Sequence, residues 1–472
     1  MLFSSTVFLY IFLPIVIFFY YIVFRKSRLL QNIFLLFASL FFYAWGEPKF
    51  VLLMIASIIV NWFFGLMVAK TSKQKALSKL MIVIDVSFNL SMLFVFKYLA
   101  FSEEILNKLF GLNMTISTIA LPIGISFFTF QAMSYVIDVY RQKAIAQNNI
   151  FYVGLYISFF PQLIAGPIVR YETVANQIVN RKETWDDLFD GFARFIVGLS
   201  KKVLLANSFS IIADQAFNTS NEVVSLSVTF SWLGAIAYTL QIFFDFSGYS
   251  DMAIGLGRMF GFHFLENFNY PYIATSISEF WRRWHISLGS WFRDYLYFPL
   301  GGSRCGKARN VLNLFIVWVL TGLWHGANYT FIVWGLMQFV LLVFEKYIGL
   351  SKKNGVIISV LKRIYTVIFI ILGMTVFRAS SVRSAVVYIK TMFGLNGTAF
   401  IDGMFTGWFV QNFFLLVIGV VLCTPLLKIL GDRVKNSTIA GFAKDGDLSC
   451  LFVLSVSNLI SSSYNPFIYF NF

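Results

Sequence analysis

Stretches of about twenty apolar residues recur along the whole chain, and they constrain its fold more than any other feature. Twenty residues is the length that an α-helix needs to cross the hydrocarbon core of a bilayer. Apolar residues make up 58% of the 472 residues and charged residues 12%. An average globular protein has roughly 25% charged residues, so this chain lacks the polar surface of a soluble enzyme. A disordered chain is excluded by the same composition. The sequence predicts an all-α polytopic membrane protein.

Twelve segments are candidate transmembrane helices, which predicts about eleven or twelve crossings. They are 6–24, 29–45, 50–69, 79–98, 119–137, 190–206, 228–246, 311–326, 330–347, 357–377, 412–430 and 448–465. The stretch 150–168 is also apolar, but Pro161, Gly166 and Pro167 interrupt it, so we expect a re-entrant segment that is buried in protein or lines a cavity. The segment 247–310 combines aromatic and basic residues, which predicts helices that lie in the membrane interface or dip into the protein.

The basic residues predict how the chain is oriented. With the N-terminus outside, the cytoplasmic loops contain 28 Lys and Arg residues and the outer loops contain five. Lys and Arg accumulate on the cytoplasmic side of membrane proteins, so both termini are expected outside the cytoplasm. We attribute the net charge of +15 to loops that contact anionic membrane lipids, and not to nucleic-acid binding. Basic residues follow the first apolar segment and do not precede it, so this segment is expected to remain as a span.

His325 lies near the far end of the apolar segment 311–326, in a chain with only three histidines. On a continuous helix, Thr321 and Asn328 would share its face, at positions i−4 and i+3. Ionisable groups at membrane depth usually face a cavity or the interior of a helix bundle. Desolvation favours the neutral imidazole, which can accept a proton. The pattern predicts a catalytic base, and a histidine that is hydrogen-bonded between helices is the alternative.

His285 belongs to a segment rich in tryptophan and arginine. At helical spacing, one apolar stripe would contain Trp281, Trp284, Leu288, Trp291 and Tyr295. Arg282, His285 and Arg293 fall outside that stripe. The pattern indicates either an amphipathic helix on the membrane surface or a helix that brings His285 to a shared cavity. Spacing alone does not decide between these two interpretations.

The third histidine, His263, is flanked by Phe262 and Phe264, and we expect a structural role for it. The three histidines are 22 and 40 residues apart, with no helical pair and no cysteine knuckle beside them. This spacing does not fit a zinc site, so we predict neither a metal ion nor a permanently bound cofactor.

Longer motifs resemble a known family. Trp281–Leu288 (WRRWHISL), Trp291–Tyr297 (WFRDYLY) and Pro299–Gly302 (PLGG) are similar to the signature of the membrane-bound O-acyltransferases, and Trp324–Ala327 (WHGA) resembles the second histidine motif of that family. Further matches are Phe42–Gly46, Phe160–Pro167, Asp245–Asp251 and Asn465–Phe470. The core signature spans about 240–345, and 1–472 resembles a single integral-membrane acyltransferase domain. The detailed match is to the bacterial branch that contains the membrane subunit of alginate O-acetyltransferase.

The resemblance implies a ring of helices around a funnel-shaped tunnel in the bacterial cytoplasmic membrane. His325 carries over as the catalytic residue and His285 as its partner. The acyl group would start on a cytoplasmic thioester, acetyl-CoA, and be used on an extracytoplasmic polysaccharide such as an alginate-like polymer or peptidoglycan. A surface-exposed acetyltransferase often completes the transfer in this branch, so a partner protein is expected.

The expected substrate contacts extend beyond the two histidines. We include Trp324, Thr321 and Asn328 beside His325, and we expect the basic segment to receive the phosphates of CoA through Arg282, Arg283 and Arg293. Two alternatives stay open. One is a D-alanyl-transferring member of teichoic-acid synthesis. The other is a lipid or polysaccharide transporter without catalytic activity, which charged residues within spans, such as Asp85, would favour.

Overall fold

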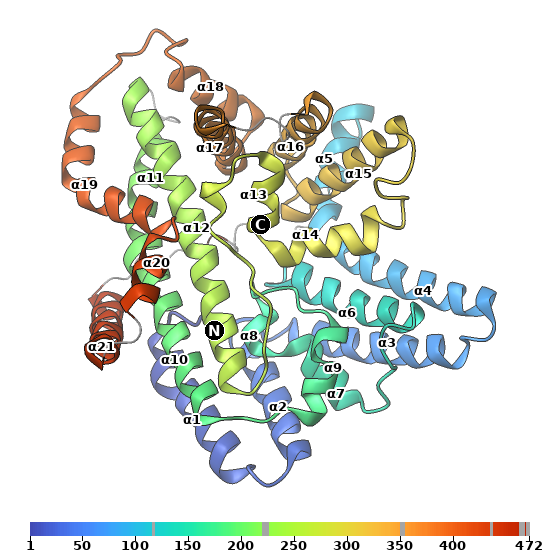
Figure 1. The fold of residues 1–472 in the computed structure, drawn as a ribbon. Coiled ribbons are helices and arrows are strands. Elements are labelled where there is room, and N and C mark those ends of the chain that lie inside the picture. Colours follow the sequence, from blue (N-terminus) through green and yellow to red (C-terminus); the bar gives the residue numbers. More distant parts are fainter. Residues whose placement is uncertain (116–118, 220–225, 350–354, 435–437, 462–467, 469–472) are drawn as a thin grey trace. The chain divides into compact units, whose positions relative to one another are not determined.

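The computed structural model describes residues 1–115, 119–219, 226–349, 355–434, 438–461 and 468. These residues form helices joined by turns and loops, with no β-strand among them, which confirms the all-α prediction (Figure 1). The chain divides into two compact units. Unit 1 comprises Met1–Ile196 and Tyr249–Leu265, and unit 2 comprises Val197–Gly248 and Glu266–Phe472. The closing family motif Asn465–Phe470 lies outside the described residues, apart from Ile468.

Unit 1 is built from long apolar helices and short buried ones. Its elements are η1 (Phe8–Phe12), α1 (Leu13–Phe18), η2 (Phe19–Val23), α2 (Arg28–Gly46), α3 (Val51–Lys70), α4 (Lys75–Leu93), η3 (Phe94–Tyr98), α5 (Leu99–Phe110), α6 (Ile125–Tyr140), α7 (Ile150–Ser158), α8 (Phe160–Leu163), α9 (Tyr171–Asn180) and most of α10 (Trp185–Ser200). Helix α6 packs on α3 and α4, and all of its residues except Ile137 and Tyr140 are buried. It is therefore the central helix of this unit.

The apolar stretch 150–168 is broken where the sequence predicts a break. Helix α7 ends at Ser158, and Phe159 turns the chain with a ψ angle of 114° before the single turn of α8. Pro161 lies in the first turn of α8, where a proline has no backbone hydrogen bond to lose. The freed N–H of Phe160 donates to Ser39 Oγ at 3.1 Å. The broken backbone is thus buried and satisfied by protein; its re-entrant course in the membrane stays a prediction.

Unit 2 contains the segment with the family signature. Its elements are η4 (Lys201–Ala206), α11 (Asn207–Thr219), α12 (Val228–Met259) as far as Gly248, η5 (Pro271–Ile273), α13 (Ile277–Arg283), α14 (Ile286–Phe292), η6 (Arg293–Tyr297), α15 (Lys307–His325), α16 (Tyr329–Ile348), α17 (Val356–Arg378), α18 (Val382–Met392), α19 (Gly403–Leu422), α20 (Leu426–Val434) and α21 (Thr438–Ser461).

Helices α15 and α16 form an antiparallel pair through glycines. A Cβ atom on Gly335 of α16 would lie 2.4 Å from the carbonyl oxygen of Trp318 in α15, and one on Gly322 would lie 2.3 Å from the carbonyl oxygen of Phe331. Small residues allow two membrane helices to approach until their backbones touch. This close contact fixes the end of α15, and His325 is its last residue.

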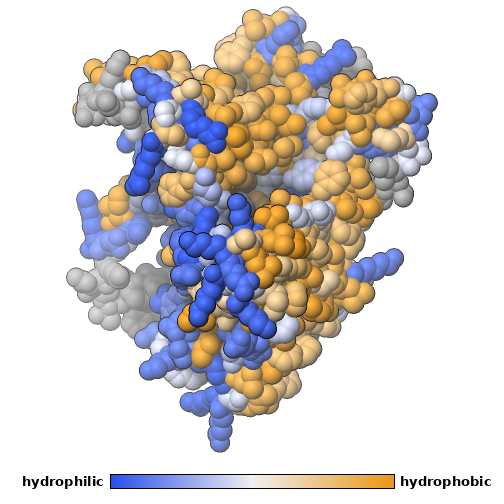
Figure 2. Space-filling model, turned by 90° about the vertical axis from the view of Figure 1, so that its right-hand side faces the viewer, coloured by the Kyte–Doolittle hydropathy of each residue, from blue (hydrophilic) through white to orange (hydrophobic). Residues whose placement is uncertain are grey.

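Seven helical stretches among the described residues are long and apolar enough to cross a membrane. They are Arg28–Gly46, Val51–Lys70, Lys75–Phe110, Trp185–Asn218, Tyr329–Ile348, Val356–Arg378 and Gly403–Leu422. Large apolar side chains are exposed along them, as at Phe37, Phe41 and Trp45 of α2. Figure 2 shows apolar side chains over much of one face of the molecule. The chain is a multi-pass membrane protein; the ring, the funnel and the count of eleven or twelve crossings stay predictions.

Helix α12 is longer than its predicted span. The span was expected at 228–246, but the helix continues to Met259. Ser247 and Ser250 follow the expected end and are buried, at 3% and 2% exposure. A Cβ atom on Gly248 would lie 2.7 Å from the carbonyl oxygen of Gly198, so the helix is closely packed there. Polar and small residues after position 246 therefore mark a packed helix surface and not the end of the helix.

Candidate functional site

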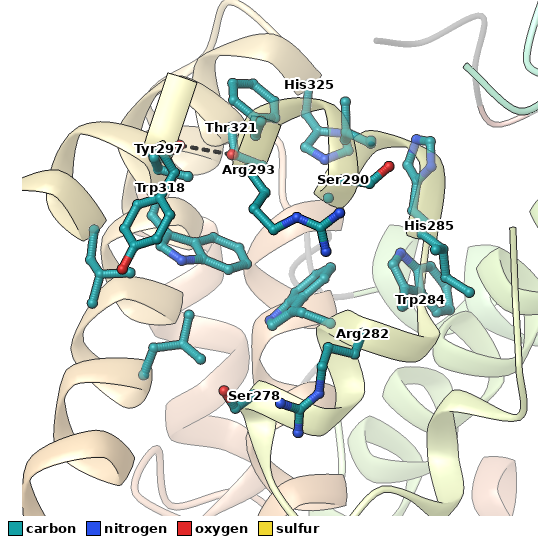
Figure 3. Close-up of a pocket in the computed structure, with 18 residues that line it drawn as sticks. Ser278, Arg282, Trp284, His285, Ser290, Arg293, Tyr297, Trp318, Thr321 and His325 are labelled. Carbon is teal, nitrogen blue, oxygen red and sulfur yellow. Dashed lines mark hydrogen bonds between the residues drawn. The ribbon is translucent and has the colours of Figure 1, made fainter. Parts of the chain in front are cut away.

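Unit 2 contains a cavity of about 310 Å³ that is lined by α13, α14, η6 and α15, with Leu342 of α16 (Figure 3). Most of the wall is apolar or aromatic. Its polar and ionisable residues are Ser278, Arg282, His285, Ser290, Arg293, Tyr297, Thr321 and His325. An apolar pocket into which a few polar groups converge is typical of a binding or active site.

The segment Trp281–Tyr295 does not form the single helix that the apolar stripe assumed. Helix α13 ends at Arg283 and α14 begins at Ile286. His285 lies at the break with φ 44° and ψ 54°, a left-handed conformation that is uncommon for residues other than glycine. The predicted stripe is therefore wrong as one helical face, because its members lie on separate elements. The break places His285 in the cavity wall, at 3% exposure, and not on the surface.

His285 is held in an apolar and aromatic environment. Its ring meets Phe246 edge-on, with 4.6 Å between ring centroids, and its Nδ1 atom lies 3.3 Å from Oδ1 of Asn267. Residue 285 lies outside the seven candidate spans. Burial lowers the pKa of His285 well below its ordinary value, and the nearby His325 lowers it further. The burial of His285 therefore favours its neutral form.

His325 is also buried, at 7% exposure, and it lines the same cavity. Three aromatic rings surround its imidazole, with centroids 5.0 to 5.2 Å away: Trp324, Trp334 and Phe377. All three rings are close to perpendicular to the imidazole, at 79 to 83°. Figure 3 shows the two imidazoles at the same end of the cavity. The structure thus brings His285 and His325 together, as the shared-cavity interpretation expected.

Trp324 and Thr321 were expected beside His325, and both lie there. The Trp324 ring packs against both histidines, at 6.0 Å from His285 and 5.0 Å from His325 between centroids, but it does not line the cavity. Thr321 lines the cavity, and its hydroxyl donates to the carbonyl oxygen of Val317 at 2.7 Å. Because that proton is used, the Thr321 oxygen faces a ligand as a hydrogen-bond acceptor only.

Asn328 does not reach the cavity. Helix α15 ends at His325, and Gly326 is extended, so the assumed i+3 relation to His325 is wrong. Asn328 is instead the N-cap of α16, where its Oδ1 accepts from the N–H of Thr330 at 3.1 Å. Its Nδ2 donates to the carbonyl oxygen of Ser380 at 3.2 Å. The residue organises the turn between α15 and α16, and capping explains its position.

The three arginines separate into two groups. Arg282 and Arg293 line the cavity, whereas Arg283 does not. Arg283 forms an ion pair with Glu279 at 2.8 Å and donates to the carbonyl oxygen of Asn269 at 3.1 Å. Arg293 pairs with its neighbour Asp294 at 2.9 Å. Two of the three arginines that we expected to bind the phosphates of the acyl donor therefore line the cavity.

Glu345 caps helix α13, a role that the sequence did not predict. It lies in α16 at 4% exposure, and its carboxylate accepts from the backbone N–H groups of Ile277 and Ser278 at 2.6 and 3.0 Å. These are the first N–H groups of α13, where a negative charge also interacts favourably with the positive end of the helix dipole. The sequence carried no signal for this cap, because it comes from a helix almost 70 residues later.

The third histidine, His263, lies outside the cavity, and the prediction that the chain holds no metal ion concerns the whole chain. His263 belongs to unit 1 and is exposed, and its Nε2 lies 3.2 Å from Oδ1 of Asp187. The structural role expected for His263 stays a prediction. Among the described residues, no group of three or more His, Cys, Asp and Glu side chains is arranged to hold a metal ion.

Comparison with known proteins identifies a family match over most of the chain. The model of the membrane-bound O-acyltransferase family matches residues 37–377, a range that includes both cavity histidines. A protein of Pseudomonas putida named "Probable alginate O-acetylase" is 38% identical, with 100% of each chain covered. The peptidoglycan O-acetyltransferase of Helicobacter pylori is 33% identical and covers 100% of this chain, with 98% of its own length matched. The teichoic acid D-alanyltransferase of Bacillus subtilis is 30% identical, over 48% of this chain and 60% of its own length.

Proposed function

The chain belongs to the membrane-bound O-acyltransferase family, and we propose that it moves an acetyl group from a cytoplasmic thioester for O-acetylation of an extracytoplasmic polysaccharide. It is an O-acyltransferase, as the sequence resemblance indicated. The observation that carries the proposal is the cavity of unit 2, because it gathers two buried histidines on an apolar wall within the matched range.

Acetyl-CoA is the donor that the relatives and the charges favour. The full-length relatives are named for O-acetylation, whereas the D-alanyl-transferring relative matches 48% of the chain. Arg282 and Arg293 line the cavity and supply guanidinium groups for the phosphates of CoA. An acetyl-CoA molecule whose phosphates bind these residues would present its thioester to the two histidines.

His325 is the proposed general base. The imidazole accepts the proton of an attacking hydroxyl while the hydroxyl oxygen bonds to the carbonyl carbon of the thioester. The C–S bond then breaks, and the imidazolium returns the proton to the thiolate, so the products are an O-acetyl ester and free CoA. General base catalysis of this kind contributes about 10²–10⁴-fold to the rate. His285 lies in the same wall and orients the reacting groups.

The acceptor belongs outside the cytoplasm in this proposal. One full-length relative is named for alginate and another for peptidoglycan, and these names support a polysaccharide as the final acceptor. An extracytoplasmic acetyltransferase partner would complete the transfer to the polymer. The cytoplasmic membrane of a bacterium is the proposed location, because it separates a cytoplasmic donor from an outer acceptor.

The direct test uses the purified protein in liposomes of bacterial lipid, with polysaccharide and an extracytoplasmic membrane extract supplied as the hydroxyl acceptor and the partner fraction. Acetyl-CoA labelled in the acetyl group is added to the face that carries the basic loops, and release of CoA thiol and formation of alkali-labile acetyl ester are both measured. We expect both signals with the unaltered protein and neither above background with His325→Ala.

Two results would contradict the proposal. If the protein leaves acetyl-CoA intact in the presence of polysaccharide and of extracytoplasmic membrane extract, acetyl-CoA is not the donor. If it consumes a D-alanyl thioester of a carrier protein instead, the teichoic-acid alternative replaces the acetyl proposal.

A further inference from the structure

We propose that Asn267 is a positioning residue that fixes His285 in the tautomer with the proton on Nδ1 and leaves Nε2 as the only proton acceptor of that ring. The inference rests on the proposed function, because it assigns the reactive atom of His285 within that reaction. Asn267 is fully buried, at 0% exposure, in the loop that precedes α13.

The orientation of the Asn267 amide is fixed by a backbone group. Its Oδ1 atom lies 3.1 Å from the backbone nitrogen of Ser287. A backbone N–H only donates, so the amide atom that faces it is the oxygen and not the nitrogen. The hydroxyl of Ser287 donates to the same oxygen at 2.9 Å. Two donors of one residue therefore hold the amide oxygen in place.

The same oxygen decides the tautomer of His285. Nδ1 of His285 lies 3.3 Å from Asn267 Oδ1, and an amide oxygen only accepts. Nδ1 must therefore carry the hydrogen in this contact. A neutral imidazole has one N–H, so the lone pair of the His285 ring is on Nε2. Ser287 Oγ lies 3.4 Å from Nδ1, and its oxygen is compatible with the same N–H.

Asn267 also holds the backbone of the helix break. Its carbonyl oxygen accepts from the N–H of Ile286 at 3.0 Å, directly after His285. Two residues along, the N–H of Asn269 donates to the carbonyl oxygen of Arg283, directly before the break, at 2.9 Å. Residues 267–269 thus bind both sides of His285. A left-handed residue persists only where its surroundings hold it, and these bonds provide that restraint.

The chemical consequence is that the His285 imidazole in the cavity wall has a defined donor atom, Nδ1, and a defined acceptor atom, Nε2. With Nδ1–H donating to Asn267, the Nε2 atom can accept a hydrogen bond and so orient the hydroxyl substrate. Rotation of the ring or a change of tautomer would break the Nδ1 contact. Groups that orient a reactive histidine from behind are typically worth 10–100-fold in rate in metal sites, and we expect a loss of about that size here.

The tautomer is measured by ¹⁵N NMR of protein labelled at histidine. The chain has only three histidines, so spectra of His263→Gln and His325→Gln assign the His285 signals. We expect a protonated Nδ1 and an unprotonated Nε2 in the unaltered protein at neutral pH. In Asn267→Leu, which keeps the branched shape of the side chain and has no acceptor, the Nε2–H form should become a major population.

Kinetics provide the second readout. Asn267→Leu should lower kcat by about 10–100-fold and leave the KM for acetyl-CoA within a factor of about three. Asn267→Asp keeps an acceptor opposite Nδ1–H and should recover most of kcat. Its carboxylate favours the imidazolium, so the acidic limb of the pH profile should move to higher pH. A merely structural role would produce neither the recovery nor the shift.

Asn313→Leu is the matched control. Asn313 is also a fully buried asparagine of unit 2, but its amide donates to the carbonyl oxygens of Leu300 and Gly302 and does not contact a histidine in the structure. This variant should lose stability and keep the His285 tautomer and the pH profile.

An Nε2–H signal for His285 in the unaltered protein overturns the inference, as does a folded Asn267→Leu with an unchanged tautomer or unchanged kcat. The NMR result decides the tautomer even if the protein transfers no acetyl group, so failure of the proposed function is distinguished from failure of this inference. If Asn267→Leu does not fold, the unaltered protein and Asn267→Asp still provide the tautomer and the pH shift.

Discussion

At the residue scale, the two cavity histidines differ in their proposed roles and in their backbone conformations. His325→Ala should lower acetyl transfer by at least about 10²-fold, because it removes the group proposed to accept the proton of the attacking hydroxyl. His285 has a left-handed backbone that asparagine tolerates, so His285→Asn removes the imidazole with less strain than alanine would introduce. It should impair transfer less completely than His325→Ala.

Acetyl ester formed per milligram of folded protein measures these effects, and His263→Ala, in unit 1, should remain close to the unaltered protein. Substantial ester formation by His325→Ala would remove the general-base assignment. Equal losses in all three variants would indicate damage to the fold.

The arginines allow a prediction with an internal control. Arg282→Gln and Arg293→Gln should raise the KM for acetyl-CoA, because these side chains line the cavity. Arg283→Gln should change KM little, since Arg283 pairs with Glu279 away from the cavity. Initial rates over a range of acetyl-CoA concentrations measure the three values. The same KM shift in all three variants would indicate a general effect of surface charge and not a donor site.

At the element scale, α13 depends on a cap from another helix. Glu345→Gln keeps one acceptor for Ile277 and Ser278 and turns the second oxygen into a donor, so one N–H loses its partner. We expect a loss of about 1–2 kcal/mol of stability, visible as a lower Tm in detergent. Glu104→Gln, in an exposed surface pair, is the control and should leave Tm unchanged. An unaltered Tm for Glu345→Gln would refute the capping role.

The contact between α15 and α16 gives the second prediction at this scale. Gly335→Ala should destabilise the protein by about 1–3 kcal/mol, because the new Cβ meets the backbone of Trp318 and neither helix can yield locally. Gly407→Ala is the matched control in α19, where a Cβ atom would meet nothing within 4 Å. Thermal unfolding should show a lower Tm for Gly335→Ala alone. If both variants keep the Tm, the two helices are not packed as closely as the structure describes.

At the scale of the whole molecule, the charge distribution predicts orientation. A phosphatase reporter fused after Phe472 should be active, and one inserted after Thr71, beside Lys70 and Lys73, should be inactive, because the basic loops are expected in the cytoplasm. Phosphatase activity in intact cells measures both. An inactive C-terminal reporter would mean that one of the twelve predicted segments does not cross, and 311–326, whose helix α15 is not among the seven candidate spans, is the first to re-examine.

Several properties of this protein followed from the sequence by itself. Apolar stretches of about twenty residues with few charges are stable as helices in a bilayer, because a helix gives each backbone N–H and C=O a partner without water. The same constraint makes a histidine at the end of an apolar segment conspicuous, so His325 could be singled out before the fold was known. The signature around His285 also identified the family, as the comparisons confirm.

The tertiary structure decided what depends on partners far away in the chain. The backbone of His285 is held in a left-handed conformation because Asn267, 18 residues earlier, binds the N–H of Ile286 directly after it. Helical periodicity in the sequence does not reveal such a bond. Asn328 leaves the cavity because α15 ends three residues before it and α16 needs a cap. Arg282 and Arg283 are neighbours in sequence, yet only Arg282 lines the cavity, since Glu279 and Asn269 hold Arg283 elsewhere. Local pattern predicts which residues are costly to bury, whereas long-range hydrogen bonds determine where each one points.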